Sequence, residues 1–378
     1  MIYLDYAATT PMSDNALDMY VKAAKKAYGN SSSLHDIGEM SARTLEASRK
    51  IIGDCIHASE KGIYFTGGGS EANVLIIQSL LKSLPSTKNH IITTEIEHSS
   101  LHTFFQKLKN EGYKITFLKT DSKGRISIEE VRQSISDRTG IISIQHANSE
   151  IGTIQPIQEI GKIAKEKNIL FHSDCVQTFG KIPLHVEELN VDALSISSHK
   201  IYGPKGIGAA YINPSIHWQP VIPGTTHESG FRPGTVDVPS IAAFATAAKD
   251  IVRKLEANLD HYHNLRREFI DSLTLYNERI TLINEKDPSS LPTIFPLVVH
   301  GIEGQYMMLE CNRFGYAIST GSACQVGMQA PSRSLTAIGF HVHEAKQYIR
   351  ISTGIQTTTQ DLQSLLKTMQ KIIHQFTR

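Results

Sequence analysis

The chain has 378 residues, a formal net charge of +1 and 20% charged residues. This length allows two domains of roughly 100 to 250 residues each, or one large domain with an appendage. The charges are mixed along the chain, so no basic stripe indicates direct binding to nucleic acid and no polybasic end indicates an anionic membrane. The first residues lack the pattern of a signal peptide, and no run of about 18 apolar residues predicts a membrane span. We therefore expect a cytoplasmic protein that acts on small molecules.

The region from about Lys61 to Ile212 alternates short β-rich runs with helical patterns such as 71–84 and 156–167. This alternation is typical of a parallel sheet covered by helices on both faces. The seven predicted strands are Ile63–Thr66, His90–Thr94, Lys114–Leu118, Ile141–Gln145, Ile169–Ser173, Ala193–Ile196 and Ile207–Ile212.

The rest of the chain predicts a second, smaller unit. The breaker-rich segment 214–235 predicts irregular structure, and 242–275 predicts a long helix. We expect a large domain at 14–257 and a small domain formed by 1–13 and 258–378. The small domain's predicted elements are strands at 297–300, 317–319 and 348–352, a helix at 305–313 and a last helix. A capping box formed by Thr358 and Asp361 marks the start of the last helix.

Polar residues follow the carboxyl ends of five predicted strands, where open α/β sheets bind their ligands. A random distribution would place them at both ends, so the pattern favours a ligand site at one rim of the sheet. These residues are the Gly67-Gly68-Gly69-Ser70 turn, His98, Asn148, Asp174 with Gln177, and Ser197 with Lys200.

Two of these residues indicate a cofactor. Lys200 lies in the connection between two predicted strands, and a lysine amine reacts with aldehydes when its surroundings support an imine. Asp174 ends a strand one strand-helix-strand unit earlier, where a buried carboxylate needs a partner. That partner is either a helix N-terminus, which Asp174 would cap, or a pyridinium nitrogen. Together a lysine and a carboxylate match the needs of pyridoxal 5'-phosphate (PLP).

Three further features are each ambiguous alone. The glycine turn before Ser70 can cradle a phosphate at a helix N-terminus, although such turns are common without ligands. His98 can stack on a flat ring and exchange protons, or be one of 17 histidines with no special role. Arg350, inside an apolar strand, must meet an anion, which is either a substrate carboxylate or an internal salt-bridge partner.

The four cysteines lie far apart without a C-x-x-C pair, which predicts neither a disulfide framework nor a metal site. Cys55, Cys175 and Cys311 fit buried small hydrophobic residues. Cys324 differs, because it lies in a small, polar, glycine-flanked stretch that could present a thiol to one site and then to another. This pattern indicates a nucleophile or a sulfur carrier.

These residues together resemble the cysteine desulfurase family, the IscS/NifS-like, long-loop group I within the class V aminotransferase superfamily of fold-type I PLP enzymes. The resemblance covers nearly the whole chain. It is carried by the motifs Leu4–Pro11, Ser70–Asn73, Glu97-His98, Asn148–Gly152, Asp174–Gln177, Ser197–Gly206, Arg232–Thr235, Gly321–Cys324 and the strand that carries Arg350.

The resemblance implies a fold-type I transferase, with a mainly parallel seven-stranded sheet in the large domain and a smaller α/β domain from the N-terminal segment and C-terminal part. It makes Lys200, Cys324 and His98 catalytic, and it implies that Asn148 and Arg350 bind the substrate carboxylate. It implies no metal. By the same resemblance PLP is bound by Gly69, Ser70, His98, Asn148, Asp174, Gln177, Ser197, His199, Lys200 and, from the other subunit of a homodimer, Thr235.

The implied reaction removes sulfur from L-cysteine, giving L-alanine and a persulfide on Cys324. The implied acceptor is an iron–sulfur scaffold, a dedicated apoenzyme or a tRNA-thiolating enzyme. The alternatives are a class V PLP aminotransferase, a cysteine or selenocysteine β-lyase, or a non-catalytic adaptor that keeps the fold. Gly67, Ser229 and Cys175 stand where the family more often has serine, arginine and alanine, and none of them removes a reacting group.

Overall fold

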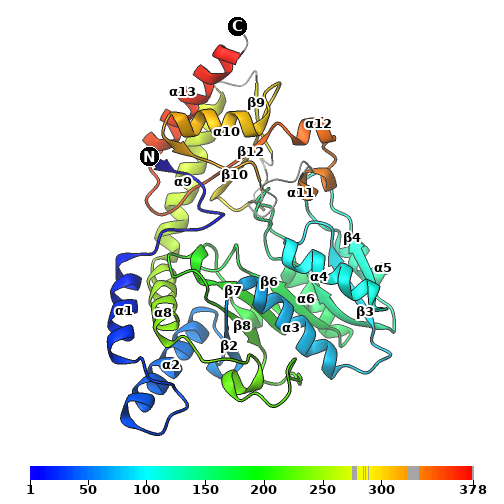
Figure 1. Ribbon diagram of the computed structural model, residues 1–378. Helices are drawn as coiled ribbons and strands as arrows, with labels where there is room; N and C mark the ends of the chain where they lie inside the picture. The colour runs from blue at the N-terminus through cyan, green and yellow to red at the C-terminus, as the bar shows by residue number, and fades with distance from the viewer. Residues whose placement is uncertain (275–278, 284, 286, 288, 322–331, 377–378) are drawn as a thin grey trace.

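The computed structural model describes residues 1–274, 279–283, 285, 287, 289–321 and 332–376. Its main sheet has seven strands in the order β2-β8-β7-β6-β5-β3-β4 (Figure 1). All neighbours pair in parallel except β8, which is antiparallel to both β2 and β7. The strands are β2 Ile63–Thr66, β3 His90–Thr94, β4 Lys114–Leu118, β5 Thr139–Ser143, β6 Leu170–Asp174, β7 Ala193–Ser197 and β8 Gly208–Ile212.

Both faces of this sheet are buried because its strands are apolar on both sides. In β3, Ile91 packs with α3 and α4 on one face, while Ile92 joins the core on the other face. Successive side chains of a strand point to opposite faces, so adjacent apolar residues need helices on both. The helices of the sheet region are α1 Asp14–Lys26, α2 Asp36–Cys55, α3 Gly69–Ser83, α4 Ser99–Asn110, α5 Ile128–Ser134, α6 Ile157–Glu166, α7 Val186–Leu189 and α8 Val238–Arg253.

Two smaller sheets, β1-β11 and β12-β10-β9, lie in the part of the protein that the long helix α9 (Leu255–Leu273) enters after α8, with α10 and α13 beside them (Figure 1). The N-terminal strand β1 pairs with β11, so the first residues of the chain join its C-terminal part. The remaining elements are β1 Ile2–Tyr3, β9 Ile280–Leu282, β10 Ile294–Val299, β11 Tyr316–Ala317, β12 Tyr348–Ser352, α10 Gly304–Arg313, α11 Arg333–Ala337, α12 Val342–Ala345 and α13 Thr359–Phe376. In the described part of the chain, no helix is both long and apolar enough to cross a bilayer.

The predicted elements are present, with the ends of several shifted by up to three residues, and two of them differ more. The helix predicted at 242–275 is two helices, α8 and α9, which meet at Lys254, and its last residue lies outside the described residues. The strand predicted at 207–212 forms, but it runs antiparallel, a direction that periodicity does not encode. The capping box that begins the last helix is present, because Thr358 and Asp361 exchange side chain to backbone hydrogen bonds.

The breaker-rich segment 214–235 is fixed to the edge strand β2 by a buried ion pair. The Glu228 carboxylate accepts two hydrogen bonds from the Arg49 guanidinium, at 2.8 and 2.9 Å, and one from the Phe65 backbone N–H at 2.6 Å. Only 2% of the Glu228 side chain is exposed. The carboxylate thus satisfies an edge amide that would otherwise be open to pairing.

Replacing Glu228 with alanine is expected to lower the free energy of unfolding by about 3 to 5 kcal/mol, because the largely buried Arg49 would keep only the exposed Glu46 as a counter-ion. Equilibrium urea unfolding measures the change. Glu46 is the matched control, since it contacts the same guanidinium from an exposed position. Glu46→Ala should cost less than about 1 kcal/mol. Equal costs for the two substitutions would contradict the assignment.

Lowering the pH should destabilise the folded protein through His172, a fully buried residue of β6. Its Nδ1 is 2.9 Å from the Ser143 hydroxyl, and burial lowers its pKa from 6.5 to about 3. Between these values the unfolded chain binds a proton that the folded chain excludes, so stability falls as the pH falls below 6.5. The stability difference between the wild type and His172→Asn should shrink by about 2 kcal/mol from pH 6.5 to 4.5, as measured by urea unfolding. A difference independent of pH would contradict this.

Candidate active site

A cavity of about 580 Å³ opens at the carboxyl ends of the main sheet's strands. It lies where the sequence places the ligand site, because in parallel strands these ends share one edge. The cavity brings together residues from across the chain, including the N-terminal segment and β12. The predicted site residues that line it are Gly69, Ser70, His98, Asp174, Gln177, Ser197, His199, Lys200 and Arg350.

Three predicted residues are not part of this lining. Asn148 is buried beside the cavity, where its amide donates to Ile96 O and Ser334 Oγ, at 3.1 Å each, and accepts from two backbone N–H groups. Its hydrogen-bonding capacity is therefore used inside the protein. Thr235 is exposed, away from this cavity. Cys324 lies outside the described residues.

Lys200 follows β7 and reaches the N-terminal segment. Its Nζ donates to the carbonyl oxygens of Ala7 and Ala8, at 2.5 and 2.7 Å. The segment itself is fixed by Thr10, whose backbone N–H and hydroxyl both donate to His199 O. The N-terminal segment thus lines the cavity, and its carbonyl groups hold the Lys200 amine in place.

Asp174 ends β6 with its carboxylate in the cavity. One oxygen accepts from Asn73 Nδ2 at 2.7 Å, and the other from Val176 N at 3.0 Å. The side chain does not cap a regular helix, because the residues after β6 form turns. Asn73, on α3, holds the carboxylate in place, and a carboxylate held this way can pair with a cationic ring nitrogen.

The N-terminus of α3 forms a cradle for an anion. Its N-cap, Gly68, has φ 144°, and a Cβ on Gly69 would lie 2.5 Å from a Val176 methyl group. Ser197 approaches the same turn, and its buried Oγ has no hydrogen-bond partner among the described residues. An unpaired buried hydroxyl is costly, so this group indicates a missing ligand atom. Backbone N–H groups at a helix N-terminus favour a phosphate.

Two histidines in the cavity are held neutral. Burial lowers the pKa of His98, while the nearby Asp174 partly opposes this, and His98 Nδ1 is 2.8 Å from the Ser100 hydroxyl. Burial and the neighbouring lysines lower the pKa of His199 to about 4, and its Nδ1 is 3.1 Å from the Thr9 hydroxyl. Each neutral ring can therefore donate one hydrogen bond and accept another, and it can take up a proton from a reacting group.

The surroundings of Arg350 include an internal salt-bridge partner and also leave one donor for a substrate carboxylate. Its guanidinium forms a salt bridge with Asp5 at 2.6 Å and donates to Ser149 O at 2.9 Å. Its Nε is buried and has no hydrogen-bond partner in the described part of the chain. The side chain is thus both an internal ion-pair partner and a lining residue with a donor left for an anion.

The described cysteines are chemically quiet. Burial raises the pKa of Cys55, Cys175 and Cys311 to about 12, so each stays a protonated thiol at neutral pH. Cys175 adjoins Asp174 in sequence but is fully buried and does not line the cavity. The expectation that these three are inert core residues is confirmed, since a nucleophilic sulfur must be a thiolate.

Residues 2–365 match the family model for aminotransferase class-V. A putative cysteine desulfurase NifS of Bacillus subtilis is 49% identical, over 97% of this chain and 93% of the relative. A cysteine desulfurase IscS of Clostridium botulinum is 36% identical, over 99% and 94%. The chain belongs to the cysteine desulfurase family. Among solved structures, a NifS-like protein superimposes with a TM-score of 0.91 and 31% identity, each chain covered to 99%. SspA, solved in complex with cysteine, gives 0.81 and 32% over 93% of this chain and 98% of that one.

Cysteine desulfurases depend on PLP, and the cavity fits this cofactor. An amine, a carboxylate and an anion cradle are the three groups that its aldehyde, ring nitrogen and phosphate require. Lys200, Asp174 and the Gly69 turn supply them from three strand ends in one cavity. The unpaired Ser197 Oγ lies against the cradle, where a phosphate oxygen would satisfy it.

Sequence reasoning missed several groups that shape this site. Asn73 lies in a motif already noted, yet its contact with Asp174 spans 101 residues and leaves no local pattern. Asp5 pairs with Arg350 across 345 residues. Lys181 is buried four residues after Gln177, and its Nζ donates to the Gln177 amide oxygen at 3.2 Å. A lysine in an apolar context was the one signal that could have found it.

Proposed function

We propose that the protein is an L-cysteine desulfurase that uses PLP to convert L-cysteine to L-alanine and to leave a persulfide on Cys324. The observation that carries the proposal is the convergence of Lys200 and Asp174 on one cavity beside an unsatisfied anion cradle. Membership of the cysteine desulfurase family supports the choice of reaction.

The chain's own groups have distinct tasks in this reaction. When bound, PLP supplies an electron-accepting ring for the substrate's α-carbon. Asp174, held by Asn73, keeps the positive charge on the ring nitrogen. Lys200 would hold the cofactor's aldehyde group through its Nζ, and the same amine would move the α-proton of the substrate. His98, neutral and fixed by Ser100, would exchange a proton with the reacting groups in the cavity.

Substrate orientation falls to Arg350 and its surroundings. The Nε donor of Arg350 and the cavity it lines suit a carboxylate, and the Asp5 salt bridge fixes the guanidinium. The Asn148 amide donates hydrogen bonds to Ile96 O and Ser334 Oγ beside the cavity. A direct contact of Asn148 with the substrate carboxylate stays a prediction.

Sulfur leaves through Cys324. Its thiolate attacks the sulfur of L-cysteine, so that a sulfur–sulfur bond forms and the substrate's carbon–sulfur bond breaks. The carbon skeleton keeps that electron pair, gains a proton and departs as L-alanine. The three other cysteines are buried and protonated, which leaves Cys324 as the thiol for this step.

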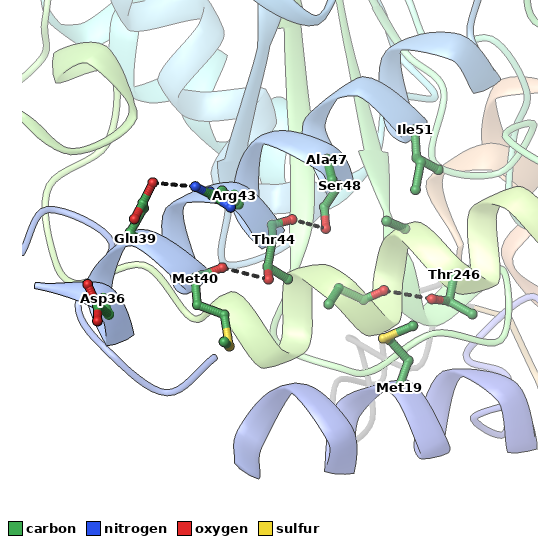
Figure 2. Close-up of a pocket in the computed structure, with 12 residues that line it drawn as sticks. Met19, Asp36, Glu39, Met40, Arg43, Thr44, Ala47, Ser48, Ile51 and Thr246 are labelled. Carbon is green, nitrogen blue, oxygen red and sulfur yellow. Dashed lines mark hydrogen bonds and ion pairs between the residues drawn. The ribbon is translucent and has the colours of Figure 1, made fainter. Parts of the chain in front are cut away.

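The proposed enzyme is a homodimer, in which Thr235 completes the cradle of the partner subunit's site. Support comes from an apolar hollow of about 550 Å³ between α1, α2 and α8. Figure 2 shows Met19 and Met40 around it, with the Glu39–Arg43 ion pair at its rim. Tyr28 and Leu34, in the connection between α1 and α2, are also largely exposed. Apolar side chains gathered in this way favour a protein partner.

Three finer assignments complete the proposal. The enzyme acts in the cytoplasm, and it passes sulfur to an iron–sulfur scaffold, a dedicated apoenzyme or a tRNA-thiolating enzyme. Residues 14–257 act as the cofactor-binding domain, and residues 1–13 with 258–378 act as the domain that carries Cys324. The pairing of β1 with β11 supports this grouping of the two ends of the chain.

The decisive experiment incubates the purified holoenzyme with L-cysteine and no keto acid. We expect stoichiometric L-alanine, and peptide mass spectrometry should find one added sulfur atom on Cys324. Adding candidate acceptor proteins should move that sulfur to them. A keto-acid requirement would instead identify an aminotransferase, and pyruvate with free sulfide would identify a β-lyase. A colourless protein that binds an acceptor would identify a non-catalytic adaptor.

A further inference from the structure

Lys181 is a buried cation beside the cofactor cavity that the reaction proposed above does not use. Only 7% of it is exposed, in the turns that follow β6. The preceding Gly180 has φ 69°, and a Cβ there would lie 2.8 Å from an Ile251 methyl group. The backbone therefore bends at a position that only glycine fills, which directs the Lys181 side chain inward.

The Lys181 ammonium fixes the orientation of the Gln177 side chain. Lys181 Nζ donates to Gln177 Oε1 at 3.2 Å, and Gln177 Nε2 donates to Ala7 O at 3.1 Å. An ammonium can only donate and a carbonyl can only accept, so the amide has one arrangement that satisfies both neighbours. Reversing it would place the NH₂ group against the ammonium and the amide oxygen against the carbonyl.

This arrangement places the Gln177 NH₂ group near the Lys200 amine. Ala7 O also accepts from Lys200 Nζ, so the amine and the Gln177 NH₂ group share one acceptor. The phenolic oxygen of PLP is ortho to the aldehyde group that Lys200 would hold, so in bound PLP it would lie near this pair. Gln177 then has a hydrogen ready for that oxygen.

The charges around Lys181 indicate an anionic ligand. Burial, followed by the positive charges of Lys200 and Arg350, lowers the pKa of Lys181 to about 7. The charge of Lys181 in turn contributes to the lowered pKa of His199. Gln177 Oε1 is the single hydrogen-bond acceptor of Lys181 Nζ among the described residues. A buried cation with a neutral acceptor and like charges nearby is unfavourable until negative charge enters the cavity.

We propose that Lys181 is a positioning residue that orients the Gln177 amide toward the phenolic oxygen of bound PLP and stabilises negative charge there. The inference rests on the proposed function, because it needs PLP bound at Lys200. Lys181 would not touch the cofactor itself. It would act on the cofactor through its hydrogen bond to Gln177.

The test is a pH titration of the visible absorption of the bound cofactor. Lys181→Met removes the charge and the donor at nearly constant volume. Loss of positive charge near the phenolic oxygen makes the cofactor hold its proton more tightly, so the titration midpoint should rise by about 1 unit. Lys162→Met, at an exposed position on α6, is the matched control and should leave the midpoint unchanged.

A double-mutant cycle separates an effect through Gln177 from a direct one. In a Gln177→Ala background, Lys181→Met should shift the midpoint by less than half as much. An equal shift in both backgrounds, or no shift in either, would overturn the proposal.

Thermal unfolding supplies a readout that does not need activity. In the apoenzyme, Lys181→Met should raise the melting temperature, because it removes a buried cation near two others. The stabilisation that saturating PLP adds should be smaller in the variant than in the wild type. A purely structural lysine would lower the melting temperature with and without PLP, which would overturn the proposal. If the wild type formed no alanine yet bound PLP with these shifts, the desulfurase assignment would fail while the role of Lys181 would stand.

Discussion

Cys324→Ser is expected to keep bound PLP and its visible absorption while losing the persulfide and at least about 10³-fold of L-alanine formation from L-cysteine. Serine keeps the size of the side chain, but its hydroxyl is a far weaker nucleophile toward sulfur at neutral pH. The groups that hold the cofactor lie in the described cavity and are untouched. Absorption spectroscopy, alanine analysis and peptide mass spectrometry together report the outcome.

Cys55→Ala is the matched control, because it removes a thiol that burial keeps protonated at the end of α2. It should retain persulfide formation and alanine production. If Cys324→Ser formed alanine at the wild-type rate, the sulfur would leave without this thiol, and the role assigned to Cys324 would be wrong. The two substitutions therefore distinguish a reacting thiol from a packing one.

Much of the site could be predicted because the chemistry is placed by the order of strands and helices. Each β-strand followed by a helix delivers its next residues to one rim, so Ser70, His98, Asp174 and Lys200 converge whatever the details of packing. That argument needs only the local periodicity of the sequence. It tolerates the reversed direction of β8, because the other strands still end at the same edge.

What could not be predicted depends on contacts between distant parts of the chain. Asn148 follows a strand like the others, yet Ile96 and Ser334 bind its amide and keep it out of the cavity lining. The Ala7 carbonyl meets Lys200 because β1 joins a sheet with β11, a pairing of two-residue strands too short for a periodic signal. The partners of a polar side chain, unlike its strand, are set by the finished fold.

Asp174→Asn is expected to lower the rate of L-alanine formation by about 10²- to 10³-fold while Lys200 still holds PLP. The amide keeps the shape of the side chain and can still accept from Val176 N, but it no longer supplies a negative charge to the ring nitrogen. Without the Asp174 charge, a positive ring nitrogen would have no counter-ion, so the α-proton should be lost more slowly. Loss should appear in the turnover number more than in the KM for L-cysteine, because the charge acts on the reacting state.

The comparison is Asp192→Asn, which makes the same change in a carboxylate that accepts from the Phe171 N–H at 2.8 Å away from the cavity. Its activity should match the wild type, because an amide oxygen can replace that acceptor. Equal activity of Asp174→Asn and the wild type would show that the ring nitrogen needs no counter-charge here. Since Asn73 Nδ2 already satisfies one oxygen of Asp174, that result would reassign the carboxylate to holding α3 against β6.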